Sequence, residues 1–177
     1  PSLLFRFTSR TMIAMSTTER LPRSPELMSR DDTALLVVDM QEKLLPFIQH
    51  RQRVIWNVRR LIDGARLLGL EIAATEQYPK GLGPTAAVLA ERLGEIPAKL
   101  TFSCGECGDI FRRLAEHGRP KVLVVGVETH VCVQQTVLDL LGDGFRADVA
   151  VDAVGSRFEI DYQTALRRME SAGAMLT

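Results

Sequence analysis

The sequence predicts an α/β fold in which helices cover both faces of a parallel sheet. Short apolar runs that suit strands alternate along the chain with stretches whose apolar residues recur at helical spacing. Such alternation is typical of parallel strands joined by crossover helices. The clearest strand-like runs are apolar throughout, as expected for strands that are buried on both faces of a sheet.

Six segments are predicted as strands. The first, ALLVVD, and the fourth, KVLVVGVE, are the short continuous apolar runs expected in the middle of such a sheet. The six are Ala34–Asp39, Glu71–Glu76, Ile96–Leu100, Lys121–Glu128, Phe145–Ala153 and a last strand that begins in AMLT at 174–177.

Five segments are predicted as helices. In the first, Val54, Val58 and Ile62 recur at helical spacing, and Gly69 ends the helix. The second begins with Pro84 in its first turn, where a missing N–H is tolerated. The five are Arg51–Gly69, Gly83–Gly94, Cys107–Gly118, Cys132–Gly144 and Ile160–Gly173.

Length and composition fit a single globular domain. The chain has 177 residues, of which 46% are hydrophobic and 25% charged. Lysine plus arginine equals aspartate plus glutamate, at 22 each, so no net charge favours nucleic acid or an anionic membrane. No apolar run approaches the ~20 residues of a membrane-spanning helix. Three cysteines argue against a disulfide framework and for a reducing compartment. We therefore expect a cytoplasmic protein that binds neither nucleic acid nor membrane.

Residues 1–32 differ from the rest of the chain. They are rich in Ser, Thr, Arg and Met and show no sustained period. One interpretation is a disordered leader, and the other is an organelle transit peptide, which several arginines among few acids would suit. The folded domain is predicted at 33–177, and a mitochondrial location is the alternative to a cytoplasmic one.

Three reactive side chains stand at the ends of three predicted strands, where parallel sheets bind their ligands. Asp39 ends the first strand and is either a turn cap or a functional carboxylate. Lys99 lies in the third, where it is either solvated or directed at a nearby carboxylate or thiolate. Cys132 follows the fourth, as an inert core thiol or as a nucleophile at a helix N-terminus. Their coincidence favours the functional interpretations.

The combination of ALLVVDMQ, AKLTFS and VVGVETHVCV resembles the isochorismatase-like cysteine hydrolases. The resemblance runs from about Thr33 to Thr177, and strand–GVETHVCV–helix is its most specific part. TEQYPKGLGPT and the segment 151–177 resemble the branch of unassigned isochorismatase-domain proteins more than the nicotinamidases. The resemblance implies a three-layer α/β/α fold around a mostly parallel sheet of six strands.

The resemblance also implies a mechanism. Asp39, Lys99 and Cys132 take the places of the family's acid, lysine and nucleophile, and a non-proline cis peptide is expected at Val127–Glu128. The N–H groups of Glu128 and Cys132 would then form the oxyanion hole. The helix N-terminus and Lys99 are expected to favour the thiolate while Asp39 accepts its proton. The implied function is hydrolysis of a small amide-like metabolite through a thioester, and the alternative is a non-catalytic binding protein of the same fold.

Several smaller expectations follow from the same motifs. Gln41, Phe47 and Tyr78 follow the first two strands and are expected to take part in substrate binding. The segment QYPKGLG lacks the histidine of the nicotinamidase metal cluster, so neither a metal nor another cofactor is expected. By analogy with relatives, the chain is expected to form a homo-oligomer.

Two other motifs give weaker alternatives. GLGPTA matches G-x-G-x-x-A, but its glycines do not directly follow a strand and no acid lies at the required distance, which argues against a nucleotide site. Cys104 and Cys107 form a single C-x-x-C pair without a partner pair, which favours incidental loop thiols over a zinc or redox site.

Overall fold

The computed structural model describes residues 23–107 and 109–177. A six-stranded sheet in the order β3-β2-β1-β4-β5-β6 forms its centre, and every ladder in it is parallel. The predicted sheet is therefore confirmed. The strands are β1 Thr33–Val38, β2 Glu71–Gln77, β3 Ala98–Lys99, β4 Lys121–Val127, β5 Arg146–Gly155 and β6 Met175–Leu176.

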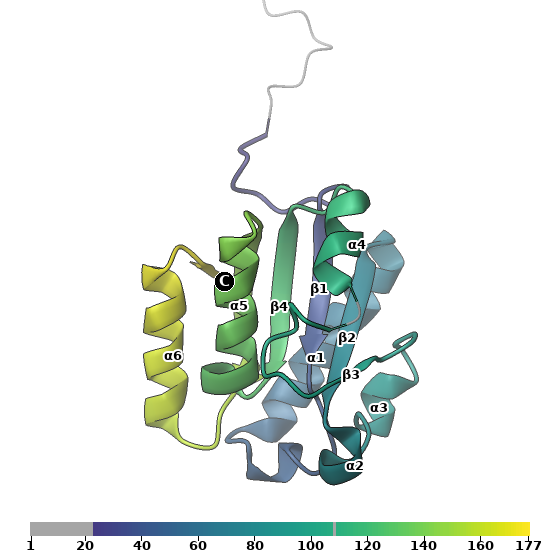
Figure 1. Ribbon diagram of the computed structural model, residues 1–177, viewed down its shortest axis with the longest axis vertical. Coiled ribbons are helices and arrows are strands. Elements are labelled where there is room, and N and C mark those ends of the chain that lie inside the picture. Colours follow the sequence, from purple (N-terminus) through teal and green to yellow (C-terminus); the bar gives the residue numbers. More distant parts are fainter. Residues whose placement is uncertain (1–22, 108) are drawn as a thin grey trace, which may run out of the picture.

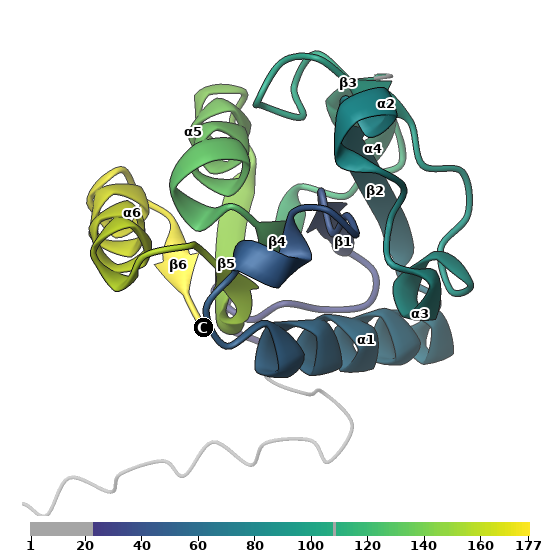
Figure 2. The ribbon, with the colours of Figure 1, turned by 90° about the horizontal axis from the view of Figure 1, so that it is seen from below.

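Helices cover both faces of this sheet, which confirms the three-layer architecture (Figure 1). Figure 2 shows α1 on one side of the sheet, with α3 beside it, and α5 and α6 on the other. The helices are α1 Arg51–Leu68, α2 Pro79–Leu82, α3 Ala87–Ala90, α4 Ile110–Glu116, α5 Gln134–Gly142 and α6 Glu159–Ser171, with single turns η1 Leu45–Phe47 and η2 Thr129–Val133.

The central strand β1 explains why the apolar run ALLVVD is continuous. Leu35 and Val37 pack in the core beneath α1, whereas Leu36 and Val38 pack in the core beneath the helices of the opposite face. All four are at most 1% exposed. Because successive side chains of a strand point to opposite faces, a strand between two helical layers needs apolar residues at every position.

The helix predicted at Gly83–Gly94 is wrong in its extent. Two four-residue helices, α2 and α3, lie on either side of an extended segment instead. Thr85 pairs with Gln41 in an isolated antiparallel bridge, and its N–H donates to the Glu76 carboxylate. Gly83 has φ +78. These contacts hold residues 83–86 extended, so helix formation is delayed to Ala87.

The helix after β4 begins earlier than predicted, and it begins irregularly. Residues Thr129–Val133 form a π-helical turn, η2, that continues directly into α5. Cys132 therefore lies inside a helical turn instead of opening the helix. Single π turns are rare and are found frequently at functional sites. The third predicted helix, Cys107–Gly118, is also shorter than expected, as α4 spans Ile110–Glu116.

The predicted leader falls mainly on residues 1–22, which lie outside the described part of the chain. Its last residues contact the domain at the amino ends of the strands. Lys121 donates to the carbonyl of Leu27 at 2.7 Å, and Arg146 pairs with Glu26 at 3.0 Å. Among the helices of the described residues, none combines the length and apolar character needed to cross a membrane.

Candidate active site

The carboxyl ends of three strands of the sheet bring the three reactive side chains together. Asp39 directly follows β1, Lys99 is the last residue of β3, and Cys132 lies in the turn after β4. Asp39 has φ +50, a left-handed conformation that aspartate tolerates better than most residues and that ends the strand at this point. The parallel topology thus collects groups that are far apart in the sequence.

Asp39 and Lys99 form a buried ion pair. Lys99 Nζ lies 2.6 Å from Asp39 Oδ2, and both side chains are at most 1% exposed. The other carboxylate oxygen, Oδ1, accepts a hydrogen bond from the Thr75 hydroxyl at 2.8 Å. A buried charge pair is stable only when its remaining polar atoms also find partners. Both oxygens of Asp39 have a partner here.

The Lys99 ammonium is surrounded by acceptors. Besides Asp39 it donates to Gln77 Oε1 at 2.9 Å and to the carbonyls of Phe102 at 2.9 Å and Thr101 at 3.3 Å. Burial is the largest single effect and lowers the pKa of Lys99. The charge of Asp39, the effect of Cys132, the hydrogen bond to Asp39 and the smaller effect of Cys104 together outweigh burial, and the pKa lies above its usual value. The ammonium is therefore charged at neutral pH.

The Cys132 thiol lies against this ion pair and is only 5% exposed. Burial raises the pKa of Cys132, the Asp39 charge raises it further, and the opposing effect of Lys99 is smaller. Lys99 lowers the pKa of Cys132 as expected, but burial and Asp39 outweigh this effect, so the expected thiolate is wrong for the free protein. Desolvation and the adjacent carboxylate keep the thiol protonated, in contact with a group that is able to accept its proton.

The turn between β4 and η2 places the main chain beside Cys132. The Val127–Glu128 peptide bond is cis, and the Glu128 carbonyl accepts hydrogen bonds from the N–H groups of Val131 and Val133. The Glu128 carboxylate is held by Arg157, whose Nε donates to Oε1 at 2.9 Å. Arg157 also lies over the ring of Phe47, 5.4 Å from its centroid. The loops after β1, β4 and β5 are thereby joined.

The three residues expected to bind substrate occupy different environments. Gln41 is fully buried, and its amide donates to the carbonyls of Gln77 at 2.9 Å and Gly83 at 2.6 Å. Both of its N–H groups thus bind the protein itself. Phe47 and Tyr78 are 62% and 50% exposed. They remain open to solvent on the loops that follow β1 and β2.

Three residues that the sequence did not single out, and one that it treated as an incidental loop thiol, complete the site. Thr75 binds Asp39, Gln77 binds Lys99, and Arg157 binds Glu128. Cys104 lies fully buried with its Sγ 3.4 Å from the Thr75 hydroxyl oxygen. The polar residues TEQ at the end of β2 could have pointed to Thr75 and Gln77, because polar side chains at the end of a buried strand need hydrogen-bond partners.

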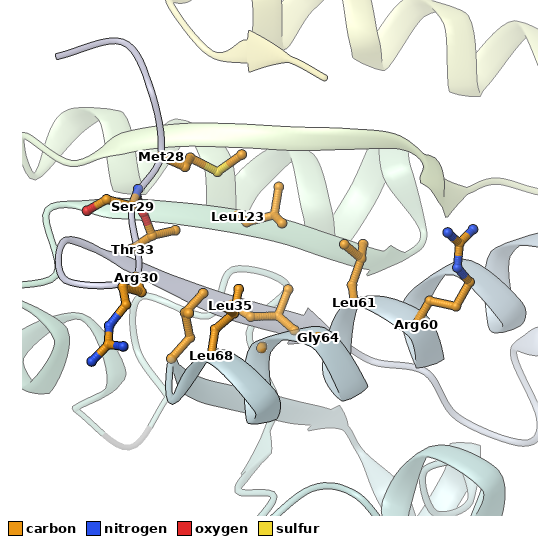
Figure 3. A pocket seen from close by; sticks show the side chains of 12 residues that line it. Met28, Ser29, Arg30, Thr33, Leu35, Arg60, Leu61, Gly64, Leu68 and Leu123 are labelled. Atoms are coloured by element: carbon orange, nitrogen blue, oxygen red, sulfur yellow. Dashed lines mark hydrogen bonds between the residues drawn. The ribbon is translucent and has the colours of Figure 1, made fainter. Parts of the chain in front are cut away.

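An apolar pocket of about 260 Å³ lies elsewhere, between α1 and the start of β1. Figure 3 shows Met28, Leu35, Leu68 and Leu123 around it. Because it lies at the amino ends of the strands, it is separated from the three reactive groups by the length of the sheet. Within residues 23–107 and 109–177, no cluster of three or more His, Cys, Asp or Glu side chains is arranged to hold a metal ion.

Comparison with known proteins identifies the family. The isochorismatase domain profile matches residues 33–177. Isochorismatase domain-containing protein 1 of Danio rerio is 40% identical over 144 residues, which are 78% of this chain and 50% of that protein. The chain thus spans about half the length of this relative.

Solved structures with the same fold include a MAR1 ribonuclease from Caenorhabditis elegans, at 43% identity and a TM-score of 0.79 over 85% of this chain and 78% of that one. YcaC from Pseudomonas aeruginosa, with hexane-2,5-diol and covalent acrylamide, has 28% identity and a TM-score of 0.80 over 88% and 80%. The Escherichia coli YcaC product, an octameric hydrolase of unknown specificity, has 27% identity and a TM-score of 0.81 over 88% and 79%. By its profile match and its relatives, the chain belongs to the isochorismatase domain family.

Proposed function

We propose that this protein is a cysteine-dependent hydrolase that cleaves a C–N bond of a small amide-like metabolite. The observation that carries the proposal is the buried ion pair of Asp39 and Lys99, which lies against the thiol of Cys132. The membership in a family that includes hydrolases supports it. A carboxylate, an ammonium and a thiol in one water-poor site are the groups that acyl transfer through a thioester requires.

In the first step, Sγ of Cys132 attacks the carbonyl carbon while Asp39 accepts the thiol proton. Because the resting thiol is protonated, proton transfer accompanies the attack instead of preceding it, and the carboxylate acts as a general base. Lys99 pairs with the Asp39 carboxylate and fixes it in position. The developing oxyanion binds the N–H groups of Glu128 and Cys132, and such donors are typically worth about 100-fold or more in rate.

In the second step, Asp39 returns the proton to the leaving nitrogen as the C–N bond breaks, which leaves a thioester on Cys132. A water molecule then gives one proton to Asp39 and attacks the thioester. The carboxylic acid product departs, and the thiol regains its proton from Asp39. The balance is one amide and one water in, and one carboxylic acid and one amine out.

A substrate panel with a matched variant tests this proposal. We expect hydrolysis of at least one member of a panel of small amides, ureas and vinyl ethers, and Cys132→Ala should lower it by about 10⁴-fold or more. Acid-quenched samples should carry the acyl group on the tryptic fragment 122–146, which contains Cys132. Full activity in Cys132→Ala on an identified substrate would show that the mechanism is wrong.

The competing possibility is a non-catalytic protein of the same fold that binds a metabolite or partner. Acrylamide separates the two, since the P. aeruginosa relative has been solved with covalent acrylamide. A nucleophilic Cys132 should be modified at neutral pH, whereas an inert core thiol should not react. RNA belongs in the substrate panel as well, because one relative is named a ribonuclease.

We infer that the protein forms a homo-oligomer, as the E. coli relative does. Leu67 and Leu100 are 89% and 78% exposed, and large apolar side chains with such exposure are suited to a subunit interface. Light scattering on the purified protein should give a mass that is a multiple of 19.7 kDa. A monomer mass at micromolar concentration would contradict this inference.

A further inference from the structure

A second buried thiol lies next to the proposed catalytic acid. Cys104 is fully buried in the loop after β3, and its Sγ is 3.4 Å from the hydroxyl oxygen of Thr75. Thr75 itself is 1% exposed, and its hydroxyl donates to Asp39 Oδ1 at 2.8 Å. The three side chains therefore form a continuous chain of polar contacts that is closed to solvent.

The hydrogens available on these three side chains determine which group donates in each contact. The Asp39 carboxylate, which pairs with Lys99, is able only to accept, and the Thr75 hydroxyl has a single hydrogen, which it gives to Asp39. The contact between Thr75 and Cys104 therefore requires the thiol to be the donor. Burial raises the pKa of Cys104 to about 11, and the Asp39 charge contributes, so the S–H group is retained at neutral pH.

Cys104 is also tied to the helix that follows the nucleophile. Its backbone N–H donates to the Thr136 hydroxyl at 3.0 Å, and Thr136 is a fully buried residue of α5. Since Cys132 lies in the turn that leads into α5, the loop after β3 and the helix are held in one arrangement around Asp39. Displacement of either element would change the direction in which the Cys104 thiol points.

We propose that Thr75 and Cys104 are positioning residues that orient the Asp39 carboxylate toward Cys132. Cys104 directs the Thr75 hydroxyl, and Thr75 holds Oδ1 while Lys99 holds Oδ2. The carboxylate is thereby fixed against rotation and presents its remaining lone pairs to the thiol. Neither residue touches the reacting atoms. The inference rests on the proposed role of Asp39 as the base for Cys132, and it adds two residues to the site.

The rate of Cys132 modification by acrylamide tests the role of the Thr75 hydroxyl. In this reaction Sγ bonds to the terminal carbon of acrylamide, and the thiol proton ends on the adjacent carbon, so a correctly placed base accelerates it. Thr75→Val keeps the shape but removes the hydroxyl, and we expect the rate to fall about tenfold. Thr75→Ser restores the hydroxyl and should return the rate to within about threefold of the unmodified protein.

A second pair of variants tests the role of the Cys104 thiol. Cys104→Ala removes the donor and should slow the modification of Cys132 about threefold, while Cys104→Ser supplies a new donor and should recover most of that loss. Tryptic fragment 122–146 carries Cys132 alone, whereas fragment 100–112 carries both Cys104 and Cys107, so mass spectrometry follows the modification of Cys132 separately from that of the other two thiols. Melting temperatures of all four variants show which of them are fully folded at the assay temperature.

The outcomes separate this inference from the proposed function. Equal rates in Thr75→Val and the unmodified protein, or a Thr75→Ser rate no higher than that of Thr75→Val, would overturn the positioning role alone. Absence of any reaction at Cys132 in the unmodified protein would overturn the nucleophile, and the positioning role with it. If Thr75→Val does not fold, the Cys104→Ala and Cys104→Ser pair decides, because equal rates in that pair contradict the chain of contacts.

Discussion

Asp39→Asn should lower kcat/KM on the substrate identified by the panel by about 10³-fold or more, since general base catalysis contributes about 10²- to 10⁴-fold. Asparagine has nearly the same shape, but its single carbonyl oxygen can accept from only one of Thr75 and Lys99, and it cannot take the proton of Cys132. Burial keeps the pKa of the Cys132 thiol high, so the thiol would stay protonated and would have no base beside it. Initial rates at saturating and limiting substrate give the two kinetic constants.

The same substitution should also destabilise the fold. Removal of one partner from a buried ion pair leaves the other charge uncompensated, at a cost of about 3–5 kcal/mol. Urea unfolding should therefore show a lower free energy of unfolding for Asp39→Asn. The double variant Asp39→Asn with Lys99→Met removes the stranded ammonium and should recover much of the stability without any activity. A folded Asp39→Asn protein with activity within tenfold of the original would contradict the base role.

Gly126→Ala should reduce the free energy of unfolding by about 4 kcal/mol or more. A loss this large is exceptional for a single substitution and requires a specific mechanism, which here is a steric clash. Gly126 lies in β4 with φ +123, and a Cβ there would come within 2.0 Å of the Val38 carbonyl oxygen and 2.7 Å of the Val38 nitrogen. These are backbone atoms of the neighbouring central strand, so no side-chain movement relieves the clash. Because Val38 immediately precedes Asp39, any relief would displace the Asp39 carboxylate.

Gly64→Ala is the matched control for Gly126→Ala. Gly64 lies inside α1, and nothing lies within 4 Å of the position that its Cβ would occupy. Alanine favours a helix over glycine by about 1 kcal/mol, so this variant should be slightly more stable than the original protein. Thermal and urea unfolding of both variants provide the comparison. Equal stability of the two variants would mean that β4 and β1 can move apart at Gly126 at little cost, contrary to the expected clash.

The sequence alone predicted the strands and the three residues that meet at their ends. This was possible because buried parallel strands are read from local apolar runs, and their carboxyl ends then converge by topology. Asp39 and Lys99 were therefore assigned to one place although 60 positions separate them, and the structure puts their charged atoms 2.6 Å apart. Their roles in catalysis remain proposals.

What the sequence could not predict depends on contacts made by the folded chain. The helix expected at 83–94 is interrupted because Gln41 and Glu76 bind the segment around Thr85, and no local pattern reports these partners. The protonation of Cys132 is a second example. A helix N-terminus favours a thiolate, but the depth of burial and the adjacent Asp39 decide the direction of the pKa, and both are tertiary properties.

The acceptors around Lys99 bear on how relatives of this protein can diverge. Two of them are main-chain carbonyls, those of Thr101 and Phe102, while the side chains of Leu100 and Phe102 are 78% and 51% exposed. Every amino acid supplies a main-chain carbonyl, whatever its side chain. Substitutions at these exposed positions therefore leave both main-chain acceptors of the lysine in place. The side chains of this loop can therefore diverge among relatives while the buried ion pair of Asp39 and Lys99 keeps its surroundings.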